Sequence, residues 1–187
     1  MGEAVNVIQT PIPGAVVVET QTHADSRGAF TRLYCARSLT DVIGPRQILQ
    51  INHSRTVRAG AVRGMHFQHP PYAEMKLVRC IRGRVWDVVV DMRADSTTFL
   101  QWHAQELDMQ SARMLVIPEG CAHGFQALEP DSELIYLHTA FYTPSAEAGL
   151  RHDDPKLRIR WPMETVELSP RDRSHALLPD DFAGIQV

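Results

Sequence analysis

Short runs rich in valine, isoleucine, threonine and aromatic residues recur along the chain, and Gly, Pro, Asp or Ser stands in almost every gap between them. Runs of this composition predict β-strands, and their regular spacing favours an antiparallel sandwich or barrel. The predicted strands are 15–20, 29–34, 47–53, 61–66, 75–81, 85–91, 99–107, 113–117, 123–128, 134–142 and 157–161. We therefore expect an all-β fold.

Helical periodicity is confined to 38–43 and 170–177, and Ser169 is the expected N-cap of the second segment. The chain has no internal repeat, low-complexity segment or linker. We therefore predict a single domain over residues 1–187, with a few short peripheral helices.

One acidic residue interrupts the apolar strand 85–91. Asp87 lies in the middle of this run, where a buried carboxylate is costly unless another group pairs with it. The preceding segment carries His66 and His69. Polar groups on the wall of a β-structure suggest a ligand site.

The composition argues against several classes of protein, including membrane, nucleic-acid-binding and disulfide-rich proteins. With 187 residues, 44% hydrophobic and 22% charged, the chain is typical of a globular protein with a proper core. No apolar run approaches the roughly 18 residues that a membrane span needs, and the N-terminus does not resemble a signal peptide, so we expect a cytoplasmic location without membrane contact. A net charge of −3 argues against nucleic acid as a partner and leaves an anionic small molecule open. Cys35, Cys80 and Cys121 are too few and too widely spaced for a disulfide framework, so we expect reduced core residues.

The segment 113–125, RMLVIPEGCAHGF, follows a strand–turn–strand pattern that opens its second strand near His123. Together with 60–84 it resembles the two half-motifs of the cupin superfamily, which implies a jelly-roll barrel with a central pocket. The alternative is that Gly120 and Gly124 serve only tight backbone geometry and that His123 is a hydrogen-bonded core residue.

A metal site is a second possibility to weigh. His66, His69, Glu74 and His123 would form a plausible ligand set. However, residues three apart on a straight strand point to opposite faces, so His66 and His69 cannot both face the pocket. We therefore predict no bound metal.

The ordered motifs point to one family. They are DSRGAF at 25–30, QINHS at 50–54, RGMHFQ at 63–68, KLVRC-x-x-G at 76–83, DVVVDMR at 87–93, IPEGCAHGF at 117–125, ELIY at 133–136, YTP at 142–144, DDP at 153–155 and LS-x-x-D at 168–172. In order and spacing this set resembles the sugar-nucleotide epimerases typified by dTDP-4-dehydrorhamnose 3,5-epimerase, from about residue 14 to 177.

The resemblance implies a cofactor-free epimerase that acts at C3, at C5 or at both carbons of a nucleotide-activated 4-keto-6-deoxy-hexose, in deoxysugar biosynthesis. It implies that His66 is the base, Asp172 orients it, and Tyr136 is the proton donor across the ring. From the residues alone, Asp172 would be a first-turn helix acid and Tyr136 a core residue.

The resemblance also implies substrate contacts. Lys76 matches a lysine beside the keto oxygen, where positive charge stabilises the enolate, and His123 and Asp87 match polar residues of the same pocket. The other matching residues are Arg27 and Arg63 for the diphosphate, and Gln50 and Asn52 for the nucleotide. In the family the equivalent of Arg27 reaches a neighbouring subunit, which implies a homodimer with an exchanged strand. Solvated edge charges remain the alternative for both arginines.

Several positions depart from the family pattern. Arg32 stands where the family has a glutamate against the base, which places the identity of the nucleotide in question. Leu137 replaces a frequent lysine, Phe141 a tyrosine and His152 a tryptophan. Because Phe141 lacks a hydroxyl, we hypothesise epimerisation at one carbon rather than two, or a differently activated sugar.

Two other classes of function remain open at this point. One is a ketoisomerase or a metal-dependent cupin enzyme, and the other is a sugar-nucleotide-binding module without catalysis. Retention of His66, Tyr136 and Asp172 favours an enzyme, because a binding module has no need of an acid and a base on opposed faces.

Overall fold

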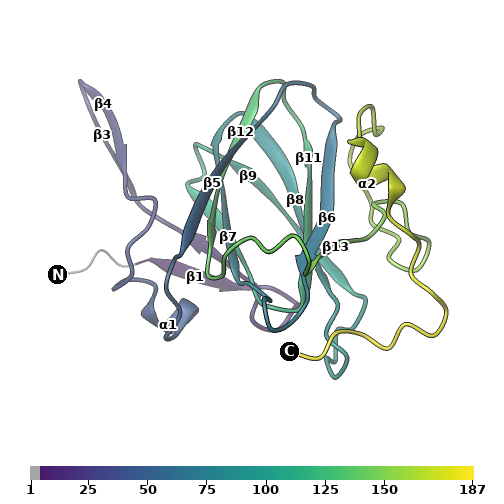
Figure 1. Ribbon diagram of the computed structural model, residues 1–187. Helices are drawn as coiled ribbons and strands as arrows, with labels where there is room; N and C mark the ends of the chain where they lie inside the picture. The colour runs from purple at the N-terminus through teal and green to yellow at the C-terminus, as the bar shows by residue number, and fades with distance from the viewer. Residues whose placement is uncertain (1–4) are drawn as a thin grey trace.

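Two antiparallel sheets face each other in the computed structural model, which describes residues 5–187 (Figure 1). The first sheet has the order β1 (Asn6–Gln9), β2 (Val16–Glu19), β10 (Arg113–Ile117), β7 (Lys76–Arg82), β12 (Ser132–His138) and β5 (Gln50–Thr56). The second has the order β13 (Glu147–Gly149), β6 (Val62–Gln68), β11 (Cys121–Ala127), β8 (Arg84–Asp91) and β9 (Trp102–Asp108). The predicted all-β cupin-type fold is confirmed.

The space between the sheets is filled by alternate residues of both. Val78 and Leu115 of the six-stranded sheet pack with Val89, Leu107 and Phe125 of the five-stranded sheet, and all five are almost fully buried. Since successive residues of a strand point to opposite faces, this alternation is what the β-branched runs of the sequence require. The apolar core occupies one part of the interior and leaves the other part to polar groups.

The segment that follows β13 covers the outer face of the five-stranded sheet (Figure 1). Leu150, Leu157 and Leu178 of this segment pack against Phe67 and Val88. The same segment carries α2 (Pro170–Ser174) to the side of β6. Ser169 caps α2 as predicted, since its hydroxyl accepts a hydrogen bond from the Asp172 N–H at 3.0 Å, but the helix ends at Ser174 and not at residue 177.

Five elements differ from the sequence prediction. The segment 157–161 forms no strand, and β12 ends at His138 although the apolar run continues to 142. The strands β1, β3 (Thr22–Asp25) and β13 were not predicted. The strand β13 forms because it pairs with β6, and β3 forms because it pairs with the following strand in a hairpin. Neither segment has the alternation of β-branched or aromatic residues that would predict a strand.

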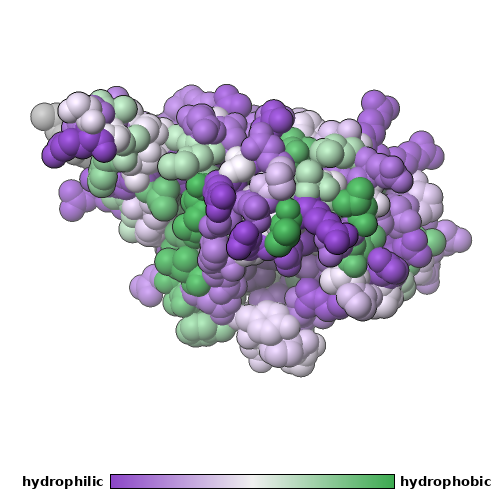
Figure 2. Space-filling view, turned by 90° about the horizontal axis from the view of Figure 1, so that it is seen from above, coloured by the Kyte–Doolittle hydropathy of each residue, from purple (hydrophilic) through white to green (hydrophobic). Residues whose placement is uncertain are grey.

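The hairpin of β3 and β4 (Gly28–Thr31) projects from the body of the molecule, as both views show (Figures 1 and 2). Every residue of β3 is exposed, and Phe30 of β4 exposes 63% of its surface. The remaining helix, α1 (Thr40–Ile43), packs Ile43 with Leu39 on the outer face of the six-stranded sheet. The hairpin therefore has little of the apolar contact that holds the other strands.

Two further expectations concern the cysteines and membranes. Cys80 and Cys121 are buried free thiols, and burial raises the pKa of each to about 12, whereas Cys35 is only half-buried. Within residues 5–187, no helix is long and apolar enough to cross a membrane. The cytoplasmic location remains a prediction.

One close contact fixes β6 against β11 and so fixes the strand that carries His66. Gly64 has a φ of +118°, and a Cβ built on it would lie 2.6 Å from the Gly124 Cα and 2.7 Å from the His123 carbonyl oxygen. The pairing register of these strands shifts at this point, between His123 and Phe125. Only glycine combines this backbone angle with this approach.

We predict that Gly64→Ala lowers the free energy of unfolding by about 3 kcal/mol, since it adds backbone strain to a clash with the backbone of β11. Thermal unfolding should then occur roughly 6–12 °C lower. Gly28→Ala is the matched control, because Gly28 has a φ of +136° but no atom within 4 Å of an added Cβ. Equal melting temperatures for the two variants would contradict the interpretation.

Candidate active site

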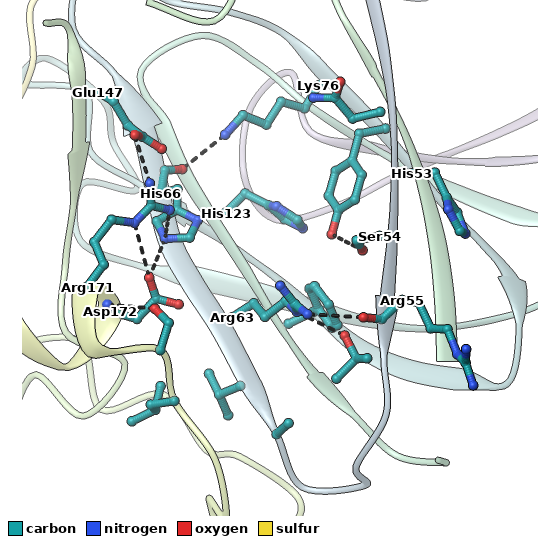
Figure 3. Close-up of a pocket in the computed structure, with 18 of the residues that line it drawn as sticks. His53, Ser54, Arg55, Arg63, His66, Lys76, His123, Glu147, Arg171 and Asp172 are labelled. Atoms are coloured by element: carbon teal, nitrogen blue, oxygen red, sulfur yellow. Dashed lines mark hydrogen bonds and ion pairs between the residues drawn. The ribbon is translucent and has the colours of Figure 1, made fainter. Parts of the chain in front are cut away.

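An open cavity of about 800 Å³ lies between the two sheets at the polar end of the sandwich (Figure 3). Eight of the eleven predicted site residues line it: Gln50, Asn52, Arg63, His66, Lys76, His123, Tyr136 and Asp172. They come from β5, β6, β7, β11, β12 and α2. The structure therefore brings together, in one place, residues that are far apart in the sequence.

His66 is oriented by Asp172. The His66 Nε2 lies 2.8 Å from the Asp172 Oδ1, and the second carboxylate oxygen accepts the Gly64 N–H at 3.2 Å. Burial by itself would raise the pKa of Asp172, but these bonds and the charge of His66 lower it to about 2. A charged Asp172 favours the tautomer with its proton on Nε2, which leaves the lone pair of Nδ1 for a substrate.

A basic residue stands on the other side of this pair. The Arg171 Nη2 lies 3.0 Å from the His66 Nε2, and its Nη1 donates to the Glu147 carboxylate at 2.9 Å. Glu147 also accepts a 2.7 Å hydrogen bond from the Tyr142 hydroxyl. Because a nitrogen that donates to Asp172 cannot also accept from Arg171, the firm partner of Arg171 is Glu147.

Tyr136 lies on the opposite sheet from His66. Its hydroxyl is 3.3 Å from the Ser54 Oγ, and its ring packs between His123 at 5.9 Å and His138 at 6.1 Å between centroids. Burial, and to a smaller extent the charge of Asp87, raises the pKa of Tyr136 above its ordinary value, against the effect of the Ser54 bond. The phenol is therefore protonated at neutral pH and has a proton to donate.

Lys76 is a buried ammonium group at the inner end of the cavity. Its Nζ donates to the His66 carbonyl oxygen at 3.2 Å and pairs with the Glu74 Oε1 at 3.2 Å. The other Glu74 oxygen is 2.8 Å from the Nδ1 of His138. Burial raises the pKa of Glu74, but His138 and Lys76 outweigh it and the pKa is lowered, so the carboxylate remains charged beside the lysine.

The partner that Asp87 requires is His123. The His123 Nε2 lies 2.8 Å from the Asp87 Oδ1, while the Oδ2 has no hydrogen-bond partner among the described residues. Burial raises the pKa of Asp87, and the nearby His123 opposes the shift. Asp87 does not line the cavity itself, so it acts on the cavity through His123.

Further polar side chains line the cavity beside these groups. Arg63 donates to the Thr56 hydroxyl at 3.0 Å and to the Arg55 carbonyl oxygen at 3.1 Å. Gln50 donates to Asn52 at 3.2 Å. Arg63 exposes its guanidinium to the cavity, where it can meet an anionic group.

Arg27 and Arg32, like Asp87, lie outside this cavity, and so do the noted departures Leu137, Phe141 and His152. Arg27 lies in the projecting hairpin, paired with Asp25 at 2.6 Å, and Arg32 lies beside Tyr34 and Cys35. The prediction that Phe141 belongs to the pocket is wrong, because β12 ends three residues earlier. Phe141 is 63% exposed, and Tyr142 lines the cavity instead. Leu137 is buried, and the His152 carbonyl oxygen accepts the Trp161 indole N–H at 2.9 Å.

His69 is exposed and lies outside the cavity, as the strand geometry predicted. Three contributors were missed from the sequence: Ser54, Arg171 and His138. Ser54 belongs to the QINHS motif, and Arg171 directly precedes Asp172. His138 follows Tyr136 by two residues, so alternation along the strand was a signal that could have found it.

Comparison with known proteins places this geometry in a family. The family model described as dTDP-4-dehydrorhamnose 3,5-epimerase matches residues 9–180. The dTDP-4-dehydrorhamnose 3,5-epimerase of Shigella flexneri is 39% identical over 168 residues, 89% of this chain and 92% of the relative. A dTDP-4-dehydrorhamnose 3-epimerase of Streptomyces niveus is 41% identical over 170 residues, 90% of this chain and 82% of the relative.

A solved structure agrees in fold over the whole length. The epimerase of Legionella pneumophila, in complex with dTDP-4-keto-L-rhamnose, superposes with a TM-score of 0.91 at 35% identity and covers 98% of each chain. With its two opposed sheets, its cavity and its matching sequence, this chain belongs to the dTDP-4-dehydrorhamnose 3,5-epimerase family.

Proposed function

We propose that this chain epimerises a dTDP-4-keto-6-deoxy-hexose at the carbons beside its ketone, with His66 as base and Tyr136 as acid. The observation that carries the proposal is that these two side chains belong to opposite sheets and line one cavity. Inversion of a carbon needs a proton removed from one face and returned to the other. An imidazole and a phenol on facing sheets meet that need.

The polar neighbours fit the individual steps. His66, held by Asp172, takes the proton next to the carbonyl through Nδ1. The Lys76 ammonium stabilises the negative charge that develops on the enolate oxygen. Because the ketone of the ground state lacks this charge, the interaction favours the transition state. Tyr136 then returns a proton to the other face, and the phenolate that it leaves is stabilised by the Ser54 hydroxyl and by the nearby charge of Arg63.

The mouth of the cavity fits the nucleotide and its diphosphate. Arg63 offers a forked guanidinium, and Gln50 and Asn52 offer amides on the adjacent edge strand β5. The relative solved with dTDP-4-keto-L-rhamnose supports dTDP as the nucleotide. Arg32 lies away from the cavity of its own chain, so its charge is no obstacle there to a thymine base.

Arg27 would act in the cavity of a second copy of the chain. The hairpin that carries it is exposed on both strands and projects beyond the sandwich (Figure 1). We propose that the hairpin packs on a partner subunit and directs Arg27 to the phosphates in the partner's cavity. Burial of Phe30 in that contact would remove a large exposed apolar side chain from water.

Single substitutions should separate base from acid. His66→Ala should lower turnover by about 10³-fold or more while dTDP affinity stays within a few-fold, because the base touches only the sugar. Tyr136→Phe should still wash substrate hydrogen out into deuterated water but form little inverted product. His69→Ala is the control and should behave like the unmodified protein. Turnover near normal in His66→Ala would rule out the proposed base.

The positions of exchange can be measured directly. In deuterated water we expect NMR to show label at both C3 and C5 of the product, since His66 and Tyr136 are placed for proton transfer on either face of the ring. The similarity to a 3-epimerase gives the second candidate, a C3-only enzyme. Label at C3 alone after prolonged incubation would favour that candidate.

Mixed dimers test whether Arg27 acts across subunits. We expect Arg27→Ala and His66→Ala dimers to be nearly inactive at low substrate concentration, and exchange of their subunits should restore about a quarter of the normal rate, because half of the dimers then hold one intact site. If Arg27 acts in its own chain, mixing restores nothing, and if it has no role, the Arg27→Ala dimers are active before mixing. Light scattering of the separate variants checks that both are dimers.

A further inference from the structure

A second ligand set overlaps the base. The Nε2 atoms of His66 and His175 and a carboxylate oxygen of Asp172 all lie within 4.8 Å of one another. We propose that these three residues form a binding site for a zinc-class divalent cation, and that occupation of the site switches the base off. Binding requires nothing of the proposed function, whereas the inhibition rests on His66 being the base.

The donor chemistry suits such an ion. Two imidazole nitrogens and one carboxylate oxygen form a set that Zn²⁺ accepts, with the fourth position open to water. Asp172 is nearly fully buried, and one of its carboxylate oxygens lies close to a ring nitrogen of each histidine. The three donor groups therefore already meet in one place.

His175 is the residue that no other role explains. Its Nε2 is buried, has no hydrogen-bond partner within the part of the chain that the structure describes, and lies 4.0 Å from the Asp172 Oδ1. A Cβ at Gly149 would lie 2.2 Å from this nitrogen, so glycine at that position makes room for the ring. The ring meets His66 edge to face, with 6.0 Å between centroids.

The distances are close to those of a bound state. Bonds of about 2.0 Å in a tetrahedral site separate the donor atoms by about 3.3 Å. The His66 nitrogen is now 2.8 Å from Asp172, and the His175 nitrogen is 4.0 Å from it. His175 follows directly on the five-residue helix α2, and its nitrogen needs to move by less than about 1 Å to reach this distance from Asp172.

Arg171 is the natural competitor for the site. Its guanidinium contacts the His66 Nε2 at 3.0 Å and the Asp172 Oδ1 at 3.6 Å, and half of the side chain is exposed. A cation at the trio would repel it towards Glu147, which already binds it. The ion would also take the lone pair of the His66 Nε2, so the proton of the neutral imidazole would sit on Nδ1, and that nitrogen could no longer accept a proton from the substrate.

The ligand set considered from the sequence is not assembled. Glu74 is paired with His138 and Lys76, His123 is paired with Asp87, and His69 is exposed outside the cavity. Of that set, only His66 belongs to the trio. The site proposed here therefore differs both in its residues and in its effect, since it opposes catalysis.

The test uses ZnCl₂ and the full chain after removal of metal with a chelator. Titration calorimetry should show one ion bound per chain, and Zn²⁺ should inhibit hydrogen exchange into the substrate, reversibly on addition of EDTA. His175→Ala should weaken Zn²⁺ binding at least tenfold and keep its activity in EDTA within about twofold. His69→Ala should bind Zn²⁺ as the unmodified protein does, and Arg171→Gln should bind it more tightly.

Each outcome decides between interpretations. Absence of Zn²⁺ binding, or binding that is equally tight in His175→Ala, would overturn the site. Loss of binding in His69→Ala alone would indicate a different ligand set. Binding through His175 without inhibition would keep the metal site and count against His66 as the base. Circular dichroism checks the fold of His175→Ala, and His175→Gln, which keeps the polar bulk, replaces it if the alanine variant unfolds.

Discussion

Burial of negative charge is the constraint on which this structure depends. The interior of a β-sandwich is apolar, yet the cavity end holds three buried carboxylates, each 2.8 Å from an imidazole nitrogen: Asp172 with His66, Asp87 with His123, and Glu74 with His138. An unpaired buried carboxylate would be strongly destabilising. Pairing with imidazoles offsets the cost of burying these carboxylates, and it also fixes the imidazoles in place. Stability and chemistry here therefore depend on the same contacts.

The two sheets contribute different side chains to the cavity. The five-stranded sheet presents His66 and His123, and the six-stranded sheet presents Tyr136 and Lys76. The apolar core holds the sheets apart at a fixed spacing, since its side chains are close-packed. A sugar ring bound between them, as proposed, would therefore meet groups of one sheet on each face.

Much of the fold was predictable because β-branched alternation is a local signal, and most strands lie where it placed them. The exceptions are strands defined by their partner, such as β13 with its sequence Glu-Ala-Gly. The site was predictable where ordered motifs carried it. The pairing of Glu74 with His138 joins residues 64 positions apart, and no local pattern reports such a contact. Phe141 was misplaced because the apolar run continues past the true end of β12.

Asp172 reaches His66 from a helix that comes after every strand of the sandwich. A chain that ended at Gly149 would contain every strand of both sheets but would lack the carboxylate that pairs with His66. Such a chain would also lack Leu150, Leu157 and Leu178, which cover the outer face of the five-stranded sheet. The last segment of the sequence therefore completes the packing of one sheet and the hydrogen bonding of His66 together.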